Sequence, residues 1–374
     1  MKYYIIAGEA SGDLHGSNLM KALKRLDKKA DFRFQGGDLM QAESEHGMMK
    51  HYRDADFMGF VQVIQNLGTI LRNLSNCKKD IVTYSPDVLI LIDYPGFNLR
   101  IAKWAKKEGL KVVYYISPQV WAWKAGRVKL IRRVVDEMFV ILPFEKDFYA
   151  KYDYEVNYVG HPLLDAIRDL PISNDFKTSN QLSEKPIIAF LPGSRGQEIK
   201  SHLMTMLEMV NQFKDYQFVI AGAPAIGLET YQKIIANFNQ VHQTDIDVAI
   251  VHQQTYDLLK SAKAAVVTSG TATLETALFN VPQVVCYKGG KVSYELFKII
   301  VKIKYISLVN LIMDKEIVTE LIQDDFNPKR LQLELETILE PTNHQAMQDE
   351  YSALHQKLGN GSASAKVAEG IFSL

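Results

Sequence analysis

The chain has 374 residues, of which 47% are hydrophobic, and its 43 lysines and arginines equal its 43 aspartates and glutamates. This length predicts two domains, and the balanced charge excludes the broad basic surface that bulk nucleic-acid binding needs. The two cysteines, Cys77 and Cys286, lie far apart and form no CxxC motif. This argues against a disulfide framework or a zinc site and is typical of a reducing compartment.

The apolar runs of the chain carry no export or membrane-spanning signal. Residues 1–7 meet Gly8 and Glu9 too early to be a signal peptide, and no apolar run approaches the length of a bilayer span. We therefore expect a cytosolic protein, which can still lie on a membrane surface.

Residues 3–7 are predicted to form the first strand, followed by a glycine-rich loop over residues 8–16 and a helix ending near Leu26. The loop lacks the GxGxxG dinucleotide fingerprint. Its glycines, acids and serine at the end of a strand still predict a ligand crevice, the alternative being a loop and helix cap with nothing bound. The candidate ligands for sugar hydroxyls are Glu9, Ser11, Gly12 and Asp13.

Two acidic pairs resemble the DxD motif with which some sugar transferases hold a metal. Asp54 and Asp56 lead into an amphipathic helix, where aspartate is a good cap, and Asp245 and Asp247 precede their strand instead of closing it. No HExxH spacing occurs among the histidines. We therefore predict no metal site.

An amphipathic helix is predicted over residues 57–74. Its apolar residues recur at helical spacing, at Phe57, Phe60, Val61, Ile64, Leu67, Leu71 and Leu74. Periodicity alone favours a helix that packs in the core, with contact to lipid as the alternative.

Residues 88–92 form the clearest buried strand of this half and lead into Asp93-Tyr94-Pro95-Gly96-Phe97-Asn98. A carboxylate at the carboxyl end of a central strand lies where open α/β sheets bind ligands, so Asp93 is a candidate general base. The alternative is a cap for the helix near Leu99, which Pro95 and Gly96 disfavour.

Three more strands are predicted in this half, over residues 112–116, 138–141 and 155–159. Between the first two lies Ser117–Trp123, with two of the three tryptophans, which either line a sugar or acyl site or anchor the loop by packing. A local basic cluster follows and either meets anionic lipid or is solvated; it comprises Lys124, Arg127, Lys129, Arg132 and Arg133.

The polar segment 169–185 is predicted to link the two domains, and a second series of alternating strands and helices follows it. Strands are expected over residues 187–191, 218–221, 248–251, 264–268 and 283–286. Alternation of strand and helix through both halves predicts parallel, doubly wound sheets.

The loop after residues 187–191 contains Gly193, Ser194 and Arg195. A backbone turn with an arginine suits a diphosphate, because a guanidinium group pairs with phosphate oxygens in a fork. The alternative is a capping box with an exposed arginine.

Residues 264–275 form a short apolar strand followed by the start of a helix. Ser269 and Thr271 are N-cap residue types, and Gly270 allows close backbone approach, which together predict a phosphate seat. Glu275 lies one helical turn after Thr271 and could accept hydrogen bonds from ribose hydroxyls. The alternative is an ordinary capped helix.

Two later segments mix polar groups with apolar runs. Residues 296–303 carry Lys298 and Lys302 among apolar residues, as a helix on an anionic bilayer or with snorkelling lysines would. Asn310 lies inside the apolar run 307–312, and a buried amide there needs partners that a ligand could supply.

Seven segments, in order along most of the chain, resemble the motifs of the lipid-A-disaccharide synthase family, inverting glycosyltransferases of the two-Rossmann-domain (GT-B) class. They are Gly8–Asp13, Asp93–Asn98, Ser117–Trp123, Gly160–Leu163, Leu191–Arg195, Ser269–Glu275 and Asn310–Leu311. The resemblance implies two Rossmann-like, doubly wound parallel-sheet domains that face a central cleft.

The resemblance also implies the reaction. The 6-hydroxyl of 2,3-diacylglucosamine 1-phosphate attacks the anomeric carbon of UDP-2,3-diacylglucosamine, giving a β-1,6-linked disaccharide and UDP. No metal or other cofactor is implied. Asp93 would be the base, although an unperturbed aspartate, with a pKa of about 3.9, is a weak base toward an alcohol. The implied donor-side residues are Gly193, Ser194, Arg195, Ser269, Gly270, Thr271, Glu275 and Asn310, and the implied acceptor-side residues are Glu9, Ser11, Gly12 and Asp13.

The expected organisation is an acceptor-binding and membrane-facing domain over residues 1–168, a linker over 169–185, a UDP-sugar-binding domain over 186–340, and helices over 341–374 that pack back toward the first domain. Acylated substrates favour the lipid-facing interpretation of Phe57, Phe60, Val61, Ile64 and Leu67, and a peripheral location on the cytoplasmic face of a Gram-negative-type inner membrane. An oligomer is possible. Two alternatives remain: a UDP-N-acetylglucosamine 2-epimerase-like enzyme, and a non-catalytic nucleotide-binding module at a membrane.

Overall fold

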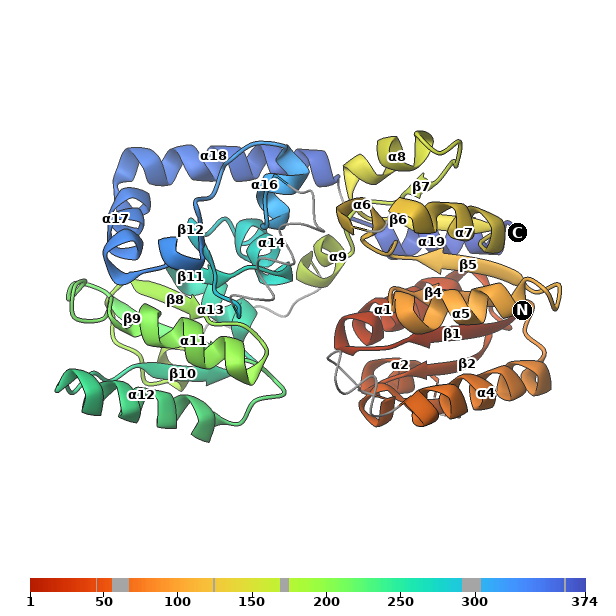
Figure 1. The fold of residues 1–374 in the computed structure, drawn as a ribbon, viewed down its shortest axis with the longest axis horizontal. Helices are drawn as coiled ribbons and strands as arrows, with labels where there is room; N and C mark the ends of the chain where they lie inside the picture. Colours follow the sequence, from red (N-terminus) through yellow and green to blue (C-terminus); the bar gives the residue numbers. More distant parts are fainter. Residues whose placement is uncertain (45, 56–66, 124, 169–174, 291–303, 360) are drawn as a thin grey trace. The chain divides into compact units, whose positions relative to one another are not determined.

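The computed structural model describes residues 1–44, 46–55, 67–123, 125–168, 175–290, 304–359 and 361–374. It divides the chain into two compact units, the first comprising Met1–Asp169 with Leu358–Leu374 and the second Leu170–Lys357. Each unit is a parallel β-sheet with helices packed on its faces (Figure 1).

Among the described residues, unit 1 contains a seven-stranded sheet in the order β3-β2-β1-β4-β5-β6-β7. The central strands are continuous apolar runs, because helices cover both faces of a doubly wound sheet. The strands are β1 (Lys2–Ala7), β2 (Asp31–Gly36), β3 (Met48–His51), β4 (Val88–Ile92), β5 (Lys111–Tyr115), β6 (Glu137–Val140) and β7 (Asn157–Tyr158).

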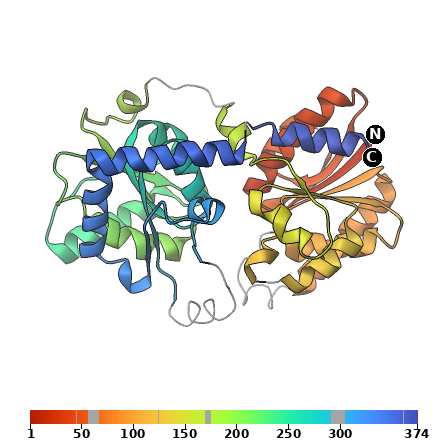
Figure 2. The same cartoon turned by 90° about the horizontal axis from the view of Figure 1, so that it is seen from above.

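The helices of unit 1 include one from the end of the chain, α19 (Ala363–Phe372), which lies beside α1 (Figure 2). The buried carboxylate of Asp165 holds the start of α19 by accepting hydrogen bonds from the backbone N–H groups of Ser362 and Ser364. The others are α1 (Ala10–Leu26), α2 (Asp38–Glu43), η1 (Tyr52–Ala55), α4 (Leu67–Tyr84), α5 (Pro95–Ala105), α6 (Val120–Trp123), η2 (Ala125–Arg127), α7 (Val128–Val134), α8 (Pro143–Ala150) and α9 (Leu163–Arg168).

Unit 2 has a six-stranded sheet among its described residues, in the order β10-β9-β8-β11-β12-β13. The strands are β8 (Ile187–Leu191), β9 (Gln217–Gly222), β10 (Ala249–His252), β11 (Ala262–Thr268), β12 (Gln283–Tyr287) and β13 (Glu320–Ile322). The helices are α10 (Phe176–Ser179), α11 (Gly196–Leu207), α12 (Leu228–His242), α13 (Thr255–Ser261), α14 (Thr271–Leu278), α16 (Leu308–Met313), η3 (Gln323–Asp325), α17 (Pro328–Leu339) and α18 (Pro341–Leu358).

The predicted fold class, two doubly wound parallel-sheet domains, is confirmed. The sequence prediction missed β2, β3 and β13. Strand β2 carries polar residues inside the sheet, and one of them, Arg33, is satisfied by an ion pair of 2.7 Å with Asp80 of α4. Such a strand lacks the unbroken apolar run by which the other central strands are recognised.

The predicted amphipathic helix is described from Leu67 onward, as α4. The positions Phe57, Phe60, Val61 and Ile64 lie outside the described residues. Further along α4, Leu74, Cys77 and Ile81 are buried in the core, whereas Leu71 is 60% exposed. The prediction that Leu71 and Leu74 share one apolar face is therefore wrong, and the described part of this helix packs in the core of unit 1.

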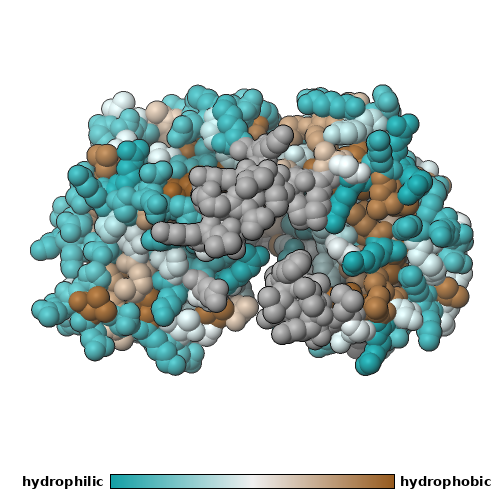
Figure 3. All heavy atoms as spheres, in the orientation of Figure 1, coloured by the Kyte–Doolittle hydropathy of each residue, from teal (hydrophilic) through white to brown (hydrophobic). Residues whose placement is uncertain are grey.

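The visible surface in Figure 3 is mostly hydrophilic, with a band of hydrophobic atoms over the α5 and α7 side of unit 1. Within the described residues, no helix combines the length and the hydropathy that crossing a bilayer requires.

Candidate functional site

Both sheets reverse their strand order next to their first strand, between β1 and β4 in unit 1 and between β8 and β11 in unit 2. Open α/β sheets bind ligands outside the carboxyl ends of the strands at such a point. In unit 1 this point carries the N-terminal site, which we define as Gly8, Glu9, Ser11, Asp93 and Tyr94. In unit 2 it carries the C-terminal site, defined as Gly193–Arg195, Ser269–Thr271 and Glu275.

The backbone of Asp93 is held in an uncommon conformation at the end of β4. Asp93 and Tyr94 both adopt the left-handed region, with φ of 43° and 47°. The Asp93 carbonyl oxygen accepts hydrogen bonds from the Tyr114 hydroxyl at 2.5 Å and from the Asn98 side-chain amide at 2.8 Å. Its N–H donates to the Tyr115 carbonyl oxygen at 3.1 Å. Asp93 therefore leaves the strand in a fixed direction.

The Asp93 carboxyl group is poised to exchange a proton near neutral pH. Burial and, after it, the neighbouring Glu9 carboxylate together raise its pKa to about 7, against a hydrogen bond from the Tyr94 backbone that lowers it. An unperturbed aspartate, with a pKa of about 3.9, would be a weaker base. A base with a pKa close to the working pH accepts a proton from an alcohol more readily than an ordinary aspartate does.

Two other residues of the N-terminal site, Glu9 and Ser11, lie at the start of α1. Glu9 is the N-cap residue of α1 but its side chain makes no capping hydrogen bond, and Ser11 is exposed. At Gly8, a Cβ atom would lie 2.3 Å from Cγ of Tyr94. Gly8 is therefore required so that the Tyr94 ring can lie against the end of β1.

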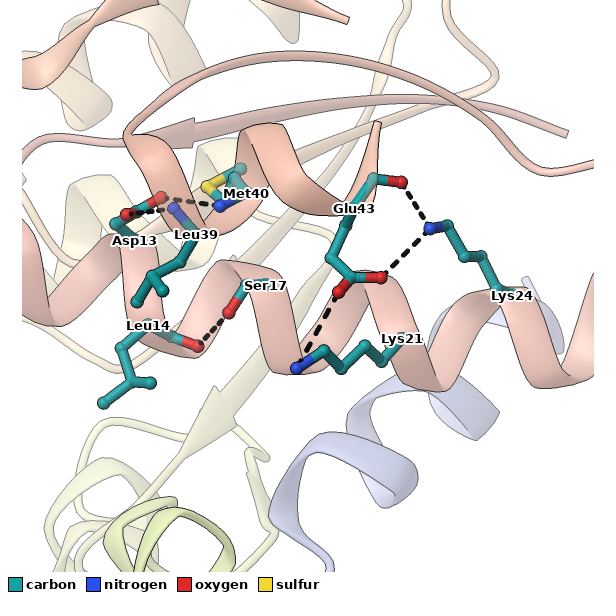
Figure 4. A network of polar contacts seen from close by, with 8 residues as sticks. All are labelled: Asp13, Leu14, Ser17, Lys21, Lys24, Leu39, Met40 and Glu43. Carbon is teal, nitrogen blue, oxygen red and sulfur yellow. Dashed lines mark hydrogen bonds and ion pairs between the residues drawn. The ribbon is translucent and has the colours of Figure 1, made fainter. Parts of the chain in front are cut away.

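Gly12 and Asp13 have structural roles that differ from the predicted contact with an acceptor sugar. A Cβ at Gly12 would lie 3.1 Å from Cβ of Ala7, so this glycine lets α1 approach β1. The buried Asp13 carboxylate accepts a hydrogen bond from the backbone N–H of Gly37 at 2.8 Å. It also accepts from the backbone N–H groups of Leu39 and Met40, each at 3.0 Å (Figure 4). It thereby caps α2, and both of its oxygens are engaged by backbone groups.

The tryptophan segment Ser117–Trp123 is fixed by packing on α8. The Trp121 ring meets the Phe144 ring edge-on, with centroids 5.0 Å apart, and the Ser117 hydroxyl lies 2.6 Å from the Tyr149 hydroxyl. Of the two alternatives predicted for these tryptophans, the described contacts of Trp121 favour anchoring of the loop.

In the C-terminal site, the loop after β8 lies beside the end of β11. Gly193 has φ of +109°, and a Cβ atom there would approach the Thr268 methyl group to 3.5 Å. Ser194 is exposed, and Arg195 is the N-cap residue of α11 without a side-chain capping bond. The Arg195 side chain is 69% exposed and pairs with Glu198 at 2.9 Å. Its other guanidinium N–H groups remain available to an anion.

The start of α14 presents backbone N–H groups at the carboxyl end of β11. Its N-cap residue is Gly270, so the prediction of a serine or threonine cap is wrong. The Ser269 hydroxyl instead donates to the Ile306 carbonyl oxygen at 3.0 Å, which fixes the loop, and Thr271 is exposed. The first-turn N–H groups of a helix have no internal partner and suit a phosphate.

One turn further along α14, the Glu275 carboxylate accepts a single hydrogen bond from the described part of the chain. Its Oε1 accepts from the Tyr256 hydroxyl at 3.0 Å. Burial raises the pKa of Glu275, while the Tyr256 hydrogen bond lowers it. The second oxygen can accept from a ligand hydroxyl.

Asn310 does not have the free amide that a donor-binding role needs. It is fully buried, and its Nδ2 donates to Val318 and Glu320 while its Oδ1 accepts from the backbone of Ile317 and Val318. The partners that were expected from a ligand are supplied by the loop before β13. Asn310 therefore stabilises that loop, and its predicted contact with the donor is not supported.

The sequence prediction gave no individual role to four residues that shape the two sites, namely Gly8, Asn98, Tyr114 and His202, although Gly8 and Asn98 lie within its motifs. His202 is buried, with Nδ1 2.6 Å from the Glu198 carbonyl oxygen and Nε2 accepting from the Lys288 N–H at 2.8 Å. It ties α11 to the end of β12. A polar residue within an apolar helix pattern was the available signal for Asn98, as for Asn310, whereas nothing local distinguished His202.

Where metals are concerned, the parts of the chain that the structure describes contain no group of three or more histidine, cysteine, aspartate or glutamate side chains arranged to hold an ion. Of the two DxD-like pairs, Asp54 lies in η1 and Asp247 lies two residues before the start of β10.

The sequence pattern of the lipid-A-disaccharide synthetase family matches residues 3–370. A lipid-A-disaccharide synthase of Geobacter sulfurreducens is 36% identical over 370 residues, which cover 97% of this chain and 94% of the relative. The enzyme of the same name from Syntrophus aciditrophicus is 39% identical over 372 residues, covering 97% and 95%.

Two solved structures have a similar fold. The UDP-GlcNAc 2-epimerase from Neisseria meningitidis, bound to UDP-GlcNAc, aligns with a TM-score of 0.70 and 14% identity over the whole of both chains. The Methanocaldococcus jannaschii UDP-GlcNAc 2-epimerase, in complex with UDP-GlcNAc and UDP, gives 0.66 and 14%, also over both whole chains. At this identity the likeness concerns the fold alone.

Proposed function

This chain belongs to the lipid-A-disaccharide synthetase family, and we propose that it transfers 2,3-diacylglucosamine from UDP-2,3-diacylglucosamine to the 6-hydroxyl of 2,3-diacylglucosamine 1-phosphate. It is an enzyme, a glycosyltransferase of lipid A biosynthesis. The products are a β-1,6-linked disaccharide 1-phosphate and UDP. The observation that carries the assignment of the base is the Asp93 carboxyl group, with its pKa near 7 at the carboxyl end of β4.

In the proposed step, the acceptor O6 attacks the anomeric carbon of the donor from the face opposite to the diphosphate. The new O6–C1 bond forms, the bond between C1 and the diphosphate oxygen breaks, and its electron pair leaves with UDP. The O6 proton passes to Asp93. Because the proton becomes acidic as the C–O bond forms, a base with a pKa near 7 is strong enough for a late transfer. Glu9 and Ser11 would position the acceptor sugar.

On the donor side, the negative charge of the leaving UDP grows in the transition state, so groups that meet this charge lower the barrier. We assign the diphosphate to Arg195 and to the N–H groups at the start of α14, with Gly193, Ser194 and Ser269–Thr271 shaping the loops. Glu275 would accept hydrogen bonds from the ribose hydroxyls through its free oxygen.

These assignments divide the work between the domains expected from the sequence. Residues 1–168 would bind the acceptor and residues 186–340 would bind the UDP-sugar, with 169–185 as the linker. Of the C-terminal residues 341–374, α19 supports α1 of the acceptor-binding unit, and α18 stays with unit 2.

The deciding experiment measures UDP release with the purified protein and both acylated substrates, and identifies the disaccharide by mass spectrometry. The 2-epimerase alternative predicts turnover of unacylated UDP-N-acetylglucosamine without an acceptor. A non-catalytic module predicts UDP binding without any product. Disaccharide formation that requires both acylated substrates supports the proposal, and either of the other results refutes it.

Replacing Arg195 by alanine is expected to weaken UDP binding by about tenfold. Hydrogen bonds to charged groups contribute roughly 1.5–3 kcal/mol, and the exposed Arg195 side chain belongs at the lower end of this range. Isothermal titration calorimetry with UDP measures the change. The matched control is Arg330→Ala, since Arg330 also pairs with a glutamate of its own helix at 2.9 Å but lies on α17. Equal affinities of the two variants would contradict the assignment.

We also propose a peripheral position on the cytoplasmic face of the inner membrane, since both substrates carry acyl chains. The exposed basic residues Lys129, Arg132 and Arg133 of α7 support contact with anionic lipid.

Replacing Phe57, Phe60 and Ile64 together by serine is expected to reduce binding to anionic liposomes several-fold. Apolar side chains that enter the bilayer contribute to the binding free energy in proportion to their buried area. Co-sedimentation measures the bound fraction, and the control is Leu333→Ser, an exposed leucine of α17. Unchanged binding, or loss of the folded state in a thermal melt, would contradict the lipid-facing role.

A further inference from the structure

We propose that Tyr114 and Asn98 are positioning residues that hold the Asp93 backbone in its left-handed conformation and thereby keep the Asp93 carboxyl group beside Glu9. This inference rests on the proposed function, because it takes Asp93 to be the base. It adds two residues outside the reacting groups, one from β5 and one from α5, to the parts of the chain on which turnover depends.

The Asp93 loop needs such support because its conformation is intrinsically unfavourable. Two consecutive residues that are not glycine, Asp93 and Tyr94, have φ of 43° and 47°. Residues with a Cβ atom avoid this region, so it persists only where surrounding contacts determine it. A loop without these contacts would relax and turn the Asp93 side chain elsewhere.

The sheet itself cannot supply all the contacts. The Asp93 N–H makes the last hydrogen bond with β5, to the Tyr115 carbonyl oxygen. Beyond this point the chain turns away, and the Asp93 carbonyl oxygen needs other donors. The Tyr114 hydroxyl supplies one at 2.5 Å, and the Asn98 amide supplies the second at 2.8 Å. Both side chains are completely buried.

Asn98 is placed for donation only. Its Nδ2 also donates to the Ile92 carbonyl oxygen at 3.1 Å, so one amide bonds both carbonyl groups at the end of β4. Its Oδ1 is buried without a hydrogen-bond partner among the described residues. A buried amide oxygen in this state is unfavourable, and a residue kept for structure alone would be better apolar. The retained amide therefore points to a requirement for its N–H groups at Asp93.

Neighbouring tyrosines of β5 provide a matched pair of variants. Successive side chains of a strand point to opposite faces of the sheet. Tyr114 belongs to the core cluster on the Asp93 side, and Tyr115 to the cluster that includes α19. Tyr114→Phe removes the hydroxyl that bonds the Asp93 carbonyl, and Tyr115→Phe removes a buried hydroxyl without contact to that loop.

Tyr114→Phe is expected to lower kcat about tenfold, less than the 10²-fold that a full 1 Å misplacement causes, because Asn98 still holds the carbonyl group. KM and UDP affinity should stay within a factor of two. The midpoint of the acidic limb of the kcat/KM profile should move below that of the native enzyme, because a released carboxyl group is better solvated and lies farther from Glu9. Tyr115→Phe should change none of these quantities.

A double-variant cycle separates positioning from general damage. If Tyr114 acts through Asp93, adding Tyr114→Phe to Asp93→Asn should cause no further loss of the residual rate. Equal kcat and pH profiles for Tyr114→Phe and Tyr115→Phe, or an additive loss in the double variant, would overturn the inference. If Asp93→Asn itself keeps its turnover, it is the assignment of the base in the proposed function that fails.

Discussion

Replacing Asp93 by asparagine is expected to lower kcat by about 10²- to 10⁴-fold, the usual contribution of a positioned general base. The amide has nearly the shape of the carboxyl group but cannot take the O6 proton. UDP binding should be retained, because the residues assigned to UDP lie in unit 2. Initial rates of UDP release and calorimetry with UDP measure the two quantities.

The pH profile of the native enzyme tests the same assignment without a substitution. Asp93 accepts a proton only when ionised, and its pKa is raised to about 7 in the folded protein. The kcat/KM value should therefore fall as the pH decreases through about 7, whereas an ordinary aspartate would stay ionised down to about pH 4.

The raised pKa of Asp93 also predicts how the stability of the fold depends on pH: stability should fall as the pH rises, whereas activity should increase. A carboxyl group with a raised pKa in the folded state holds its proton more tightly there than in the unfolded chain. Folding is therefore progressively disfavoured as the pH rises from about 4 to about 7. The Asp93→Asn protein should unfold at a higher temperature than the native protein at pH 8 and at a similar temperature near pH 4.

A matched control for Asp93→Asn is Asp87→Asn, at the other end of the same strand. Asp87 accepts a hydrogen bond from the Lys2 N–H at 2.7 Å, at the amino edge of the sheet and away from the N-terminal site. Its substitution should leave the turnover and the acidic limb unchanged. Near-native turnover of Asp93→Asn would exclude Asp93 as the base.

Replacing Gly8 by alanine is expected to reduce kcat on the order of 10²-fold, although Gly8 has no reacting group. The added Cβ atom would lie 2.3 to 2.6 Å from three carbon atoms of the Tyr94 ring, closer than any contact allows. These atoms lie at the base of the ring, so the Tyr94 backbone must move and carry Asp93 with it. Displacement of a catalytic group by about 1 Å reduces turnover by this amount.

Gly96→Ala is the matched control for Gly8→Ala. Gly96 lies two residues after Tyr94, in the first turn of α5, where an added Cβ meets no atom within 4 Å. Its kcat should stay close to that of the native enzyme. A crystal structure of Gly8→Ala with Tyr94 rotated, Asp93 in place and native turnover would refute the explanation.

The strands and the candidate site residues at their carboxyl ends could be predicted from the sequence, because both depend on the local pattern of apolar and polar residues. Strands such as β4 and β8 are buried on both faces and therefore appear as unbroken apolar runs. Ligands bind at the carboxyl ends of parallel strands, so the polar residues that follow directly, Asp93 and Arg195, become candidates without knowledge of any contact. Family resemblance then linked these candidates to a reaction.

The local sequence pattern did not predict the hydrogen-bond partners of short polar side chains. Asp13, Ser269 and Asn310 have the residue types expected in a ligand site, but in the structure each is engaged by backbone groups of its own unit. A carboxylate, hydroxyl or amide binds a ligand and a loop with the same hydrogen bonds. Which of the two it meets depends on residues that are distant in sequence, such as Gly37 for Asp13.

The sequence by itself determined the two doubly wound sheets, the loops that follow their strands and Asp93 as the candidate base. These features depend on burial and chain direction, which the order of apolar and polar residues along the chain indicates. Only the tertiary structure decided the chemistry of that aspartate. Its raised pKa comes from burial and from Glu9, and its direction comes from Tyr114 and Asn98. Glu9 and Tyr114 reach it across neighbouring strands, and electrostatic and hydrogen-bond energies depend on distance in space, which the spacing of residues along the chain does not give.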